Sequence, residues 1–232
     1  MTSMTSEHSQ LIYVSSFEEL INTKFMGQRN AICWQREVQG DFKEIVDQLE
    51  LEDDLTEISI EDLLALSLSK QGNLAREILL NDIKLLTEIG ALPSLNLIRH
   101  YERDDEFDFI STDVYSYHVD RSPIATDTFL CTYYGATSDI IPSAQATQKI
   151  LIPKIREQLK QLHQGSEEEF EEFLKENFFD LHYEVDLNAK VTNLATGQLC
   201  RLAVDHPTQY VSPCVHRAPC ENRNEYRLLL IC

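Results

Sequence analysis

The tripeptide His118-Val119-Asp120 is the part of the sequence whose residue types and spacing are best suited to chemistry. In a β-strand, residues two apart project from the same face, so the imidazole of His118 and the carboxylate of Asp120 would enter one cavity together. These two ligands are two-thirds of a 2-His-1-carboxylate triad, which holds a ferrous ion and leaves coordination positions open. The same tripeptide is compatible with two side chains on a surface strand that bind no metal. Residues elsewhere in the sequence must therefore distinguish a metal site from this alternative.

A third ligand and a cation lie near the C-terminus. His216 follows a strand-like run in the segment VSPCVHRAP, and Arg227 comes eleven positions later in the apolar run EYRLLLIC. A cation that points inward from an apolar strand must be satisfied, and a planar guanidinium suits a bidentate carboxylate. Strand alternation places Arg227 on one face with Leu229 and Ile231, opposite Leu228.

Several neighbouring residues are further candidates for this site. Arg223, in the expected turn 221–224, is the alternative to Arg227 as the carboxylate-binding cation. The hydroxyl of Thr132 is expected to help hold the same carboxylate. Tyr117 and Tyr133 are candidate substrate-pocket residues, although ordinary strand positions explain all three hydroxyl side chains equally well. Arg121 is predicted either to contact an anionic substrate group or to form a salt bridge with a nearby acid.

The motifs taken together resemble a known group. An HxD motif, a distant His and an Arg about ten residues beyond it are similar to the Fe(II)/2-oxoglutarate-dependent dioxygenases, which use the double-stranded β-helix (jelly-roll, cupin-like) fold. Within that superfamily, HVDR, FLCTYYG, HRAP and YRLLL, with NAICWQR near the N-terminus, resemble a bacterial domain family of unassigned function. The resemblance covers most of the chain.

The resemblance implies an enzyme and its cofactors. His118, Asp120 and His216 would ligate Fe(II), and Arg227 would bind the distal carboxylate of 2-oxoglutarate. The implied reaction uses O2, converts 2-oxoglutarate to succinate and CO2, and oxidises a small-molecule or amino-acid-like substrate, with hydroxylation as the expected outcome. One alternative is a cupin-type metalloprotein that uses the same ligands for isomerisation or hydrolysis. The other is a metal-free barrel that binds a ligand or a protein.

The elements expected to position these residues give an α+β fold. Residues 1–94 are predicted as a helical part, with helices beginning near Ser16, Asp41, Ser59 and Asn73 and one short strand at 30–35. Residues 95–232 are predicted as a double-stranded β-helix core, with a helical insertion at 144–180 that is a candidate lid. The expected strand-like segments are 95–101, 107–119, 126–134, 181–194, 200–204, 210–216 and 225–231.

Composition limits the partners. The chain has 232 residues, 20 Lys+Arg and 39 Asp+Glu, and a net charge of −19. Nucleic acids and anionic membranes need a basic surface, so neither is an expected partner. We expect a small-molecule substrate and a monomer or homodimer. Without a signal pattern or an apolar run of about 18 residues, the chain is predicted to be cytoplasmic.

The cysteines are predicted to be reduced thiols. The sequence contains six of them and no CxxC motif, and a chain of this length does not need disulfides for stability. A zinc site formed by Cys214, His216 and Cys220 is the alternative, although structural zinc usually shows tighter paired spacing.

Overall fold

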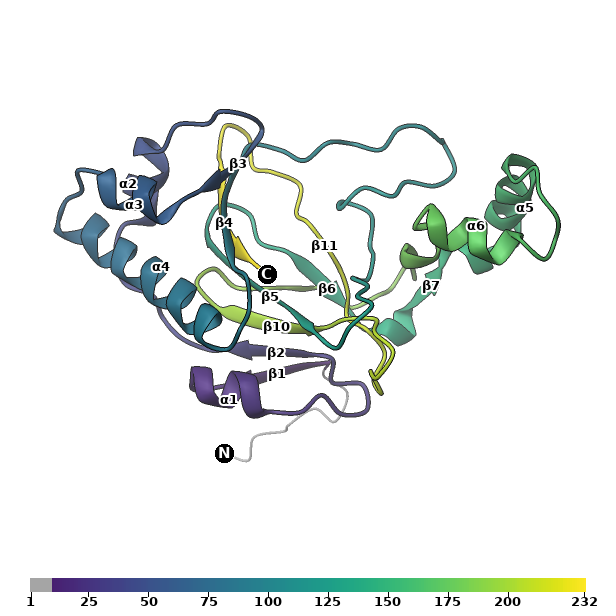
Figure 1. The fold of residues 1–232 in the computed structure, drawn as a ribbon, viewed down its shortest axis with the longest axis horizontal. Coiled ribbons are helices and arrows are strands. Elements are labelled where there is room, and N and C mark those ends of the chain that lie inside the picture. The colour runs from purple at the N-terminus through teal and green to yellow at the C-terminus, as the bar shows by residue number, and fades with distance from the viewer. Residues whose placement is uncertain (1–9) are drawn as a thin grey trace.

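A computed structural model describes residues 10–232, which form a mainly antiparallel pair of sheets with helices at two sides (Figure 1). This combination confirms the α+β class. The large sheet has seven strands in the order β1-β2-β10-β5-β12-β4-β3, and the small sheet has the order β11-β6-β9. The strands are β1 Leu11–Val14, β2 Ala31–Trp34, β3 Leu55–Ile58, β4 Ser94–Ile98, β5 Asp127–Tyr134, β6 Asp139–Ile141, β7 Ala146–Gln148, β8 Tyr183–Val185, β9 Thr192–Asn193, β10 Leu199–Ala203, β11 Val215–Arg217 and β12 Arg227–Ile231.

Residues 117–119 lie between the small sheet and a separate two-stranded sheet formed by β7 and β8. His118 forms a backbone bridge to His216 of β11 on one side and to His182 on the other. The amide of Tyr183 donates to the carbonyl of Tyr117 at 2.8 Å. The segment that contains the HxD motif therefore lies between β11 and the chain entering β8, and its register is fixed on both sides.

Helices cover the outer face of the large sheet (Figure 1). Apolar residues of α2 and α4, such as Ile45 and Leu79, form one buried cluster with outward-facing sheet residues such as Leu228. The opposite face of the sheet packs on the small sheet through a second cluster that includes Leu229 and Ile140. The helices are α1 Phe17–Asn22, α2 Phe42–Gln48, α3 Ile60–Ala65, α4 Lys70–Glu88, α5 Pro153–Leu162 and α6 Phe170–Glu176.

Side-chain caps set the helix starts in the N-terminal part. Ser16, Asp41 and Ser59 each accept a hydrogen bond from a first-turn amide, which confirms these three predicted starts. The predicted start at Asn73 is wrong, because Ser69 caps α4 through the amides of Gln71 and Gly72. The described residues up to position 94 also contribute β1, β2 and β3 to the large sheet, so this part is less helical than expected.

Two expectations in the second half need correction. Segment 107–119 forms isolated bridges instead of the expected strand, because Asp104 and Asp113 accept backbone amide hydrogens that a strand would need. The block expected as helical from 144 begins with the end of a short 3-10 helix, Ser143–Gln145, and then contains β7, which pairs with β8. Pro153 begins α5 at its first turn, a position that needs no amide hydrogen. The helices of the insertion lie at the far end from α2–α4 (Figure 1).

Two of the cysteines are paired. Cys33 of β2 and Cys200 of β10 are directly opposite in the antiparallel register and form a disulfide. This pairing corrects the expectation of reduced thiols, since opposite positions on neighbouring strands bring two side chains within bonding reach. The free cysteines of the described chain are Cys131, Cys214, Cys220 and Cys232. None of the helices between residues 10 and 232 has both the length and the apolar character to cross a membrane.

Candidate metal centre

Three predicted ligands meet in the structure. His118, Asp120 and His216 each offer one ligand atom, and these atoms lie within 4.8 Å of one another. The Nε2 of His216 is 3.6 Å from Oδ2 of Asp120. His118 and Asp120 project from the same side of their extended segment, and His216 reaches them from the neighbouring β11. The cluster could therefore hold a metal ion.

Backbone carbonyls orient both imidazoles. Nδ1 of His118 lies 2.8 Å from the carbonyl oxygen of Ser116, and Nδ1 of His216 lies 3.1 Å from that of Cys214. A carbonyl can only accept, so each Nδ1 carries the proton and each Nε2 keeps its lone pair. This is the arrangement that a metal-binding histidine needs, because the hydrogen bond fixes both tautomer and ring orientation.

The charges at the cluster favour deprotonated ligands. Burial, with the neighbouring His216, lowers the pKa of His118 to about 4, so its imidazole is neutral near pH 7. Burial opposes ionisation of Asp120, but His216 and the hydroxyl of Thr128 outweigh it and hold the pKa of this carboxyl below its usual range. Thr128 donates its hydroxyl hydrogen to Oδ2 of Asp120. Neutral imidazole and carboxylate are the forms that bind a metal.

The guanidinium of Arg227 is buried without an anionic partner. The side chain is only 4% exposed, and its donors reach the hydroxyls of Ser138 at 2.8 Å, Thr132 at 3.0 Å and Tyr101 at 3.4 Å. Among residues 10–232, no carboxylate oxygen lies within salt-bridge distance of it. Burial lowers the pKa of Arg227, although an arginine stays charged in proteins. A buried cation whose hydrogen-bond partners are all neutral is suited to bind an anion.

A cavity of about 200 Å³ joins this guanidinium to the ligand cluster. Arg227, Leu229 and Ile231 all line it, which confirms the predicted shared face of β12. Its walls also carry all three members of the ligand cluster. The cavity is thus a compartment with a potential metal at one end and a fixed positive charge at another.

A larger cleft of about 820 Å³ opens on the other side of the cluster. It shares His118, Asp120 and Val114 with the smaller cavity. Its lining includes Phe178 of the insertion and His182, which follows the insertion. A ligand in this cleft and a ligand in the small cavity would therefore approach the same cluster from two sides.

Of the other predicted site residues, some lie at the two cavities and others do not. Thr132 lies beside Arg227 as expected, whereas Arg223 is exposed and lines neither cavity. Tyr133 is on the opposite face of β5, where its hydroxyl donates to Asp82 of α4, so its assignment as a pocket residue is wrong. Tyr117 also turns away from both cavities, and its ring packs under the guanidinium of Arg217.

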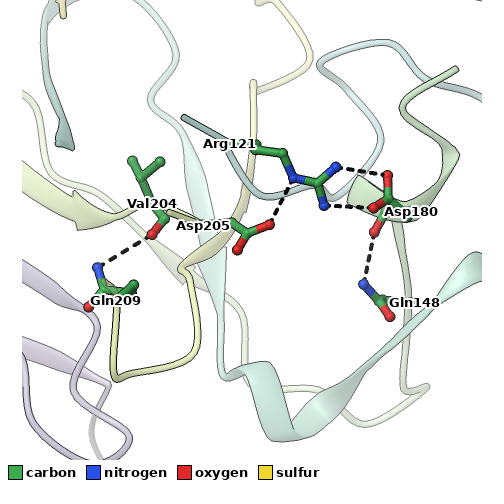
Figure 2. Close-up of polar contacts among 6 residues, drawn as sticks. All are labelled: Arg121, Gln148, Asp180, Val204, Asp205 and Gln209. Carbon is green, nitrogen blue, oxygen red and sulfur yellow. Dashed lines mark hydrogen bonds and ion pairs between the residues drawn. The ribbon is translucent and has the colours of Figure 1, made fainter. Parts of the chain in front are cut away.

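Arg121 lines the large cleft, and the salt-bridge alternative holds for it. Its guanidinium makes a paired contact with both carboxylate oxygens of Asp180, at 3.2 and 2.6 Å, and its Nε donates to Asp205 at 2.9 Å (Figure 2). Gln148 in turn donates to the backbone oxygen of Asp180. The two carboxylates satisfy the charge of Arg121, which leaves it unsuited to a further anion.

Sequence reasoning missed Ser138, Tyr101 and His182. Ser138 and Tyr101 contact Arg227 because of the register of β12 against its neighbours, and no local pattern marks either residue. His182 follows the insertion helices, and its ring centroid is 5.7 Å from that of His118. Its Nδ1 is buried without a hydrogen-bond partner, and burial lowers its pKa to about 3.

The alternative of a zinc site formed by Cys214, His216 and Cys220 is wrong. Cys220 is exposed, and Cys214 is buried with its thiol pKa raised by burial, which disfavours the thiolate that zinc requires. Among the described residues, the cluster that includes His216 contains neither cysteine.

No family model, no curated protein and no solved structure matches the chain. The function must therefore be argued from the site itself.

Proposed function

We propose that the protein is an Fe(II)- and 2-oxoglutarate-dependent oxygenase that oxidises a small-molecule substrate. The observation that carries the proposal is the buried, carboxylate-free Arg227 in the same small cavity as His118, Asp120 and His216. A dicarboxylic acid that chelates a metal with one end needs a fixed cation for its other end. The guanidinium provides the planar pair of donors that a carboxylate accepts.

The ligand set supports iron. Two imidazoles and one carboxylate, with further positions open, are typical of non-haem Fe(II) oxygenases. His118 and His216 have Nε2 available because Nδ1 is held by a backbone carbonyl in each. Asp120 is oriented by Thr128. The donor set therefore fits the ion.

The strand order favours a double-stranded β-helix core. In the large sheet β4, β12, β5 and β10 are successive neighbours, and in the small sheet the segment 117–119, β11, β6 and β9 are successive neighbours. Along the chain these eight segments alternate between the sheets, except at the step from β6 to β9, where the insertion lies. Eight strands that cross between two sheets are typical of a jelly roll.

In the proposed reaction the bound iron and cosubstrate supply the chemistry, and the side chains of the small cavity bind and orient them. When bound, the iron with 2-oxoglutarate and O2 supplies the oxidation of a substrate C–H bond, coupled to formation of succinate and CO2. Arg227, with the hydroxyls of Ser138 and Thr132, holds the distal carboxylate and so fixes the direction of the cosubstrate. Apolar Leu229 and Ile231 limit water in the small cavity. The large cleft gives the substrate its own access to the cluster.

An anaerobic titration tests the proposal. The protein should bind one equivalent of Fe(II), and subsequent 2-oxoglutarate should produce a visible metal-to-ligand charge-transfer band. Asp120→Ala should bind no iron, whereas Asp186→Ala, a matched change at an exposed aspartate directly after β8, should behave as wild type. Iron binding without a 2-oxoglutarate response would leave a metalloprotein of other chemistry. Absence of metal binding would leave a metal-free binding protein.

A further inference from the structure

The large cleft presents hydrogen-bond acceptors and lacks a free cation. Its lining includes three carboxylates and one arginine. Asp120 belongs to the ligand cluster, and Asp113 accepts amide hydrogens from Asp104, Tyr115 and Ser116. One oxygen of the remaining carboxylate, Asp205, accepts a hydrogen bond from Arg121, and the other makes no hydrogen bond with a described residue.

The arginine of the cleft is neutralised. Arg121 contacts two carboxylates, Asp180 and Asp205, so the three side chains together carry one negative charge (Figure 2). Lys149, which interacts electrostatically with His182, donates to the hydroxyl of Ser116 at 2.8 Å and does not line the cleft. An anionic substrate would find no available cation there, and it would meet unfavourable charge.

An independent observation also indicates a ligand in the cleft. His182 lines the cleft and is 4% exposed, yet its Nδ1 has no hydrogen-bond partner and its Nε2 makes no hydrogen bond with a described residue. A buried polar group without a partner costs about 1–3 kcal/mol. Because Nδ1 is enclosed by the protein, a ligand in the cleft would meet the imidazole at Nε2, which can form a hydrogen bond with a polar group of the ligand.

The rim of the cleft adds an aromatic surface. Phe178 is 61% exposed and lines the cleft beside the insertion helix α6. Exposed aromatic rings attract ammonium groups through the face of the ring. The walls also contain Pro123 and Pro207, so the body of the ligand meets apolar surface.

From these contacts we infer that the large cleft binds an amine-bearing organic substrate, whose ammonium group is recognised by Asp205 and whose N–H or O–H donors reach His182. This inference rests on the proposed function only in calling the ligand a substrate. The binding site itself does not require iron.

Three compounds with one body and different head groups test the inference: 3-phenylpropylamine, 3-phenylpropanol and 3-phenylpropanoate. Calorimetric titration of the full chain without added metal should show saturable binding of the amine, at least about tenfold tighter than of the carboxylate. Added NaCl should weaken binding of the amine and leave that of the alcohol unchanged. Equal affinities, a preference for the carboxylate, or no saturable amine binding would overturn the inference.

Two variants locate the interaction. Asp205→Asn should weaken binding of the amine about tenfold and leave the alcohol unaffected, because the amide keeps the shape and loses the charge. Glu172→Gln, which removes the same charge at an exposed position of α6 outside the cleft, should change neither. An amine affinity that is insensitive to Asp205→Asn would refute the assignment of this carboxylate.

The outcome is separable from that of the oxygenase proposal. Amine binding in a protein that binds neither Fe(II) nor 2-oxoglutarate would refute the oxygenase and support the cation site. Binding of Fe(II) and 2-oxoglutarate together with preference for the carboxylate compound would support the oxygenase and refute the cation site.

Discussion

The buried charge of Arg227 predicts that its removal weakens ligand binding without lowering the stability of the ligand-free protein. Arg227→Met takes away the guanidinium and leaves a flexible apolar chain that can fill the same space. In the ligand-free protein Arg227 is 4% exposed, and the partners of its guanidinium, Thr132, Ser138 and Tyr101, are neutral hydroxyls. The charge therefore has no ion-pair partner until an anion binds, and Glu221 stabilises it only from beyond ion-pair distance.

The magnitudes follow from these contacts. A charge-assisted, two-donor contact with a carboxylate in a buried site contributes about 2–4 kcal/mol. At about 1.4 kcal/mol for each factor of ten, Arg227→Met should weaken 2-oxoglutarate binding by about 30-fold to about 700-fold. Because an unpaired buried charge opposes folding, the ligand-free variant should equal the wild type in free energy of unfolding or exceed it by about 1 kcal/mol.

The assay combines anaerobic calorimetry of 2-oxoglutarate on the iron-loaded protein with urea unfolding of the ligand-free protein. Arg201→Met is the matched control, because Arg201 is also a buried arginine of the large sheet but donates to the backbone oxygens of Ile21 and Thr23. The control should lose about 1–3 kcal/mol of stability and retain its 2-oxoglutarate affinity. Unchanged affinity in Arg227→Met would refute the reasoning, and a loss in Arg223→Met instead would move the role to that residue.

Three further changes test neighbouring parts of the site. Thr128→Val should lower iron affinity about 10- to 100-fold by releasing Asp120, measured by competition with a chelator; equal affinity would contradict the orienting role. Tyr133→Phe should cost about 1 kcal/mol in urea unfolding, through its lost contact with Asp82, while iron and 2-oxoglutarate affinities stay constant. The pKa of His182 is about 3 in the fold and ordinarily near 6.5, so the unfolded chain binds more protons between these values and stability falls as pH decreases from 6.5 towards 3. His182→Gln should reduce this fall by at least about 1 kcal/mol, and an unchanged pH dependence would contradict the burial of a neutral imidazole.

Strand alternation made part of the site predictable. The two-residue spacing of His118 and Asp120 placed both side chains at one cavity, and the same rule placed Arg227 with Leu229 and Ile231. The rule also explains the errors. Thr132 and Tyr133 are adjacent in β5 and cannot both face the cavity, and Tyr133 is the one that faces the helices.

The surroundings of Arg227 were not predictable from local patterns. Ser138 and Tyr101 reach its guanidinium because β12 pairs with β4 and β5 in one particular register, with a shift between Leu228 and Leu229. Gly135 permits the tight approach there, since it has a φ of +84° and a Cβ on it would lie 2.5 Å from the backbone oxygen of Tyr226. Pairing register depends on the whole sheet, so single-strand periodicity carries no information about it.

The disulfide and the irregular segment before the HxD motif were also not predicted, for two different reasons. Cys33 and Cys200 are far apart in sequence, and only the pairing of β2 with β10 brings them together. Residues 107–116 contain aromatic and β-branched residues typical of strands, but the carboxylates of Asp104 and Asp113 hold the backbone in turns. Local side-chain hydrogen bonds there outweigh strand propensity.

The most direct test of the central claim is a crystal structure of the chain prepared anaerobically with Fe(II) and 2-oxoglutarate, with anomalous scattering recorded at the iron edge. The account predicts one iron peak bound by Nε2 of His118, Nε2 of His216 and the carboxylate of Asp120, with the distal carboxylate of 2-oxoglutarate on Arg227. An iron peak elsewhere, or a 2-oxoglutarate molecule that leaves the guanidinium without an anion, would contradict it.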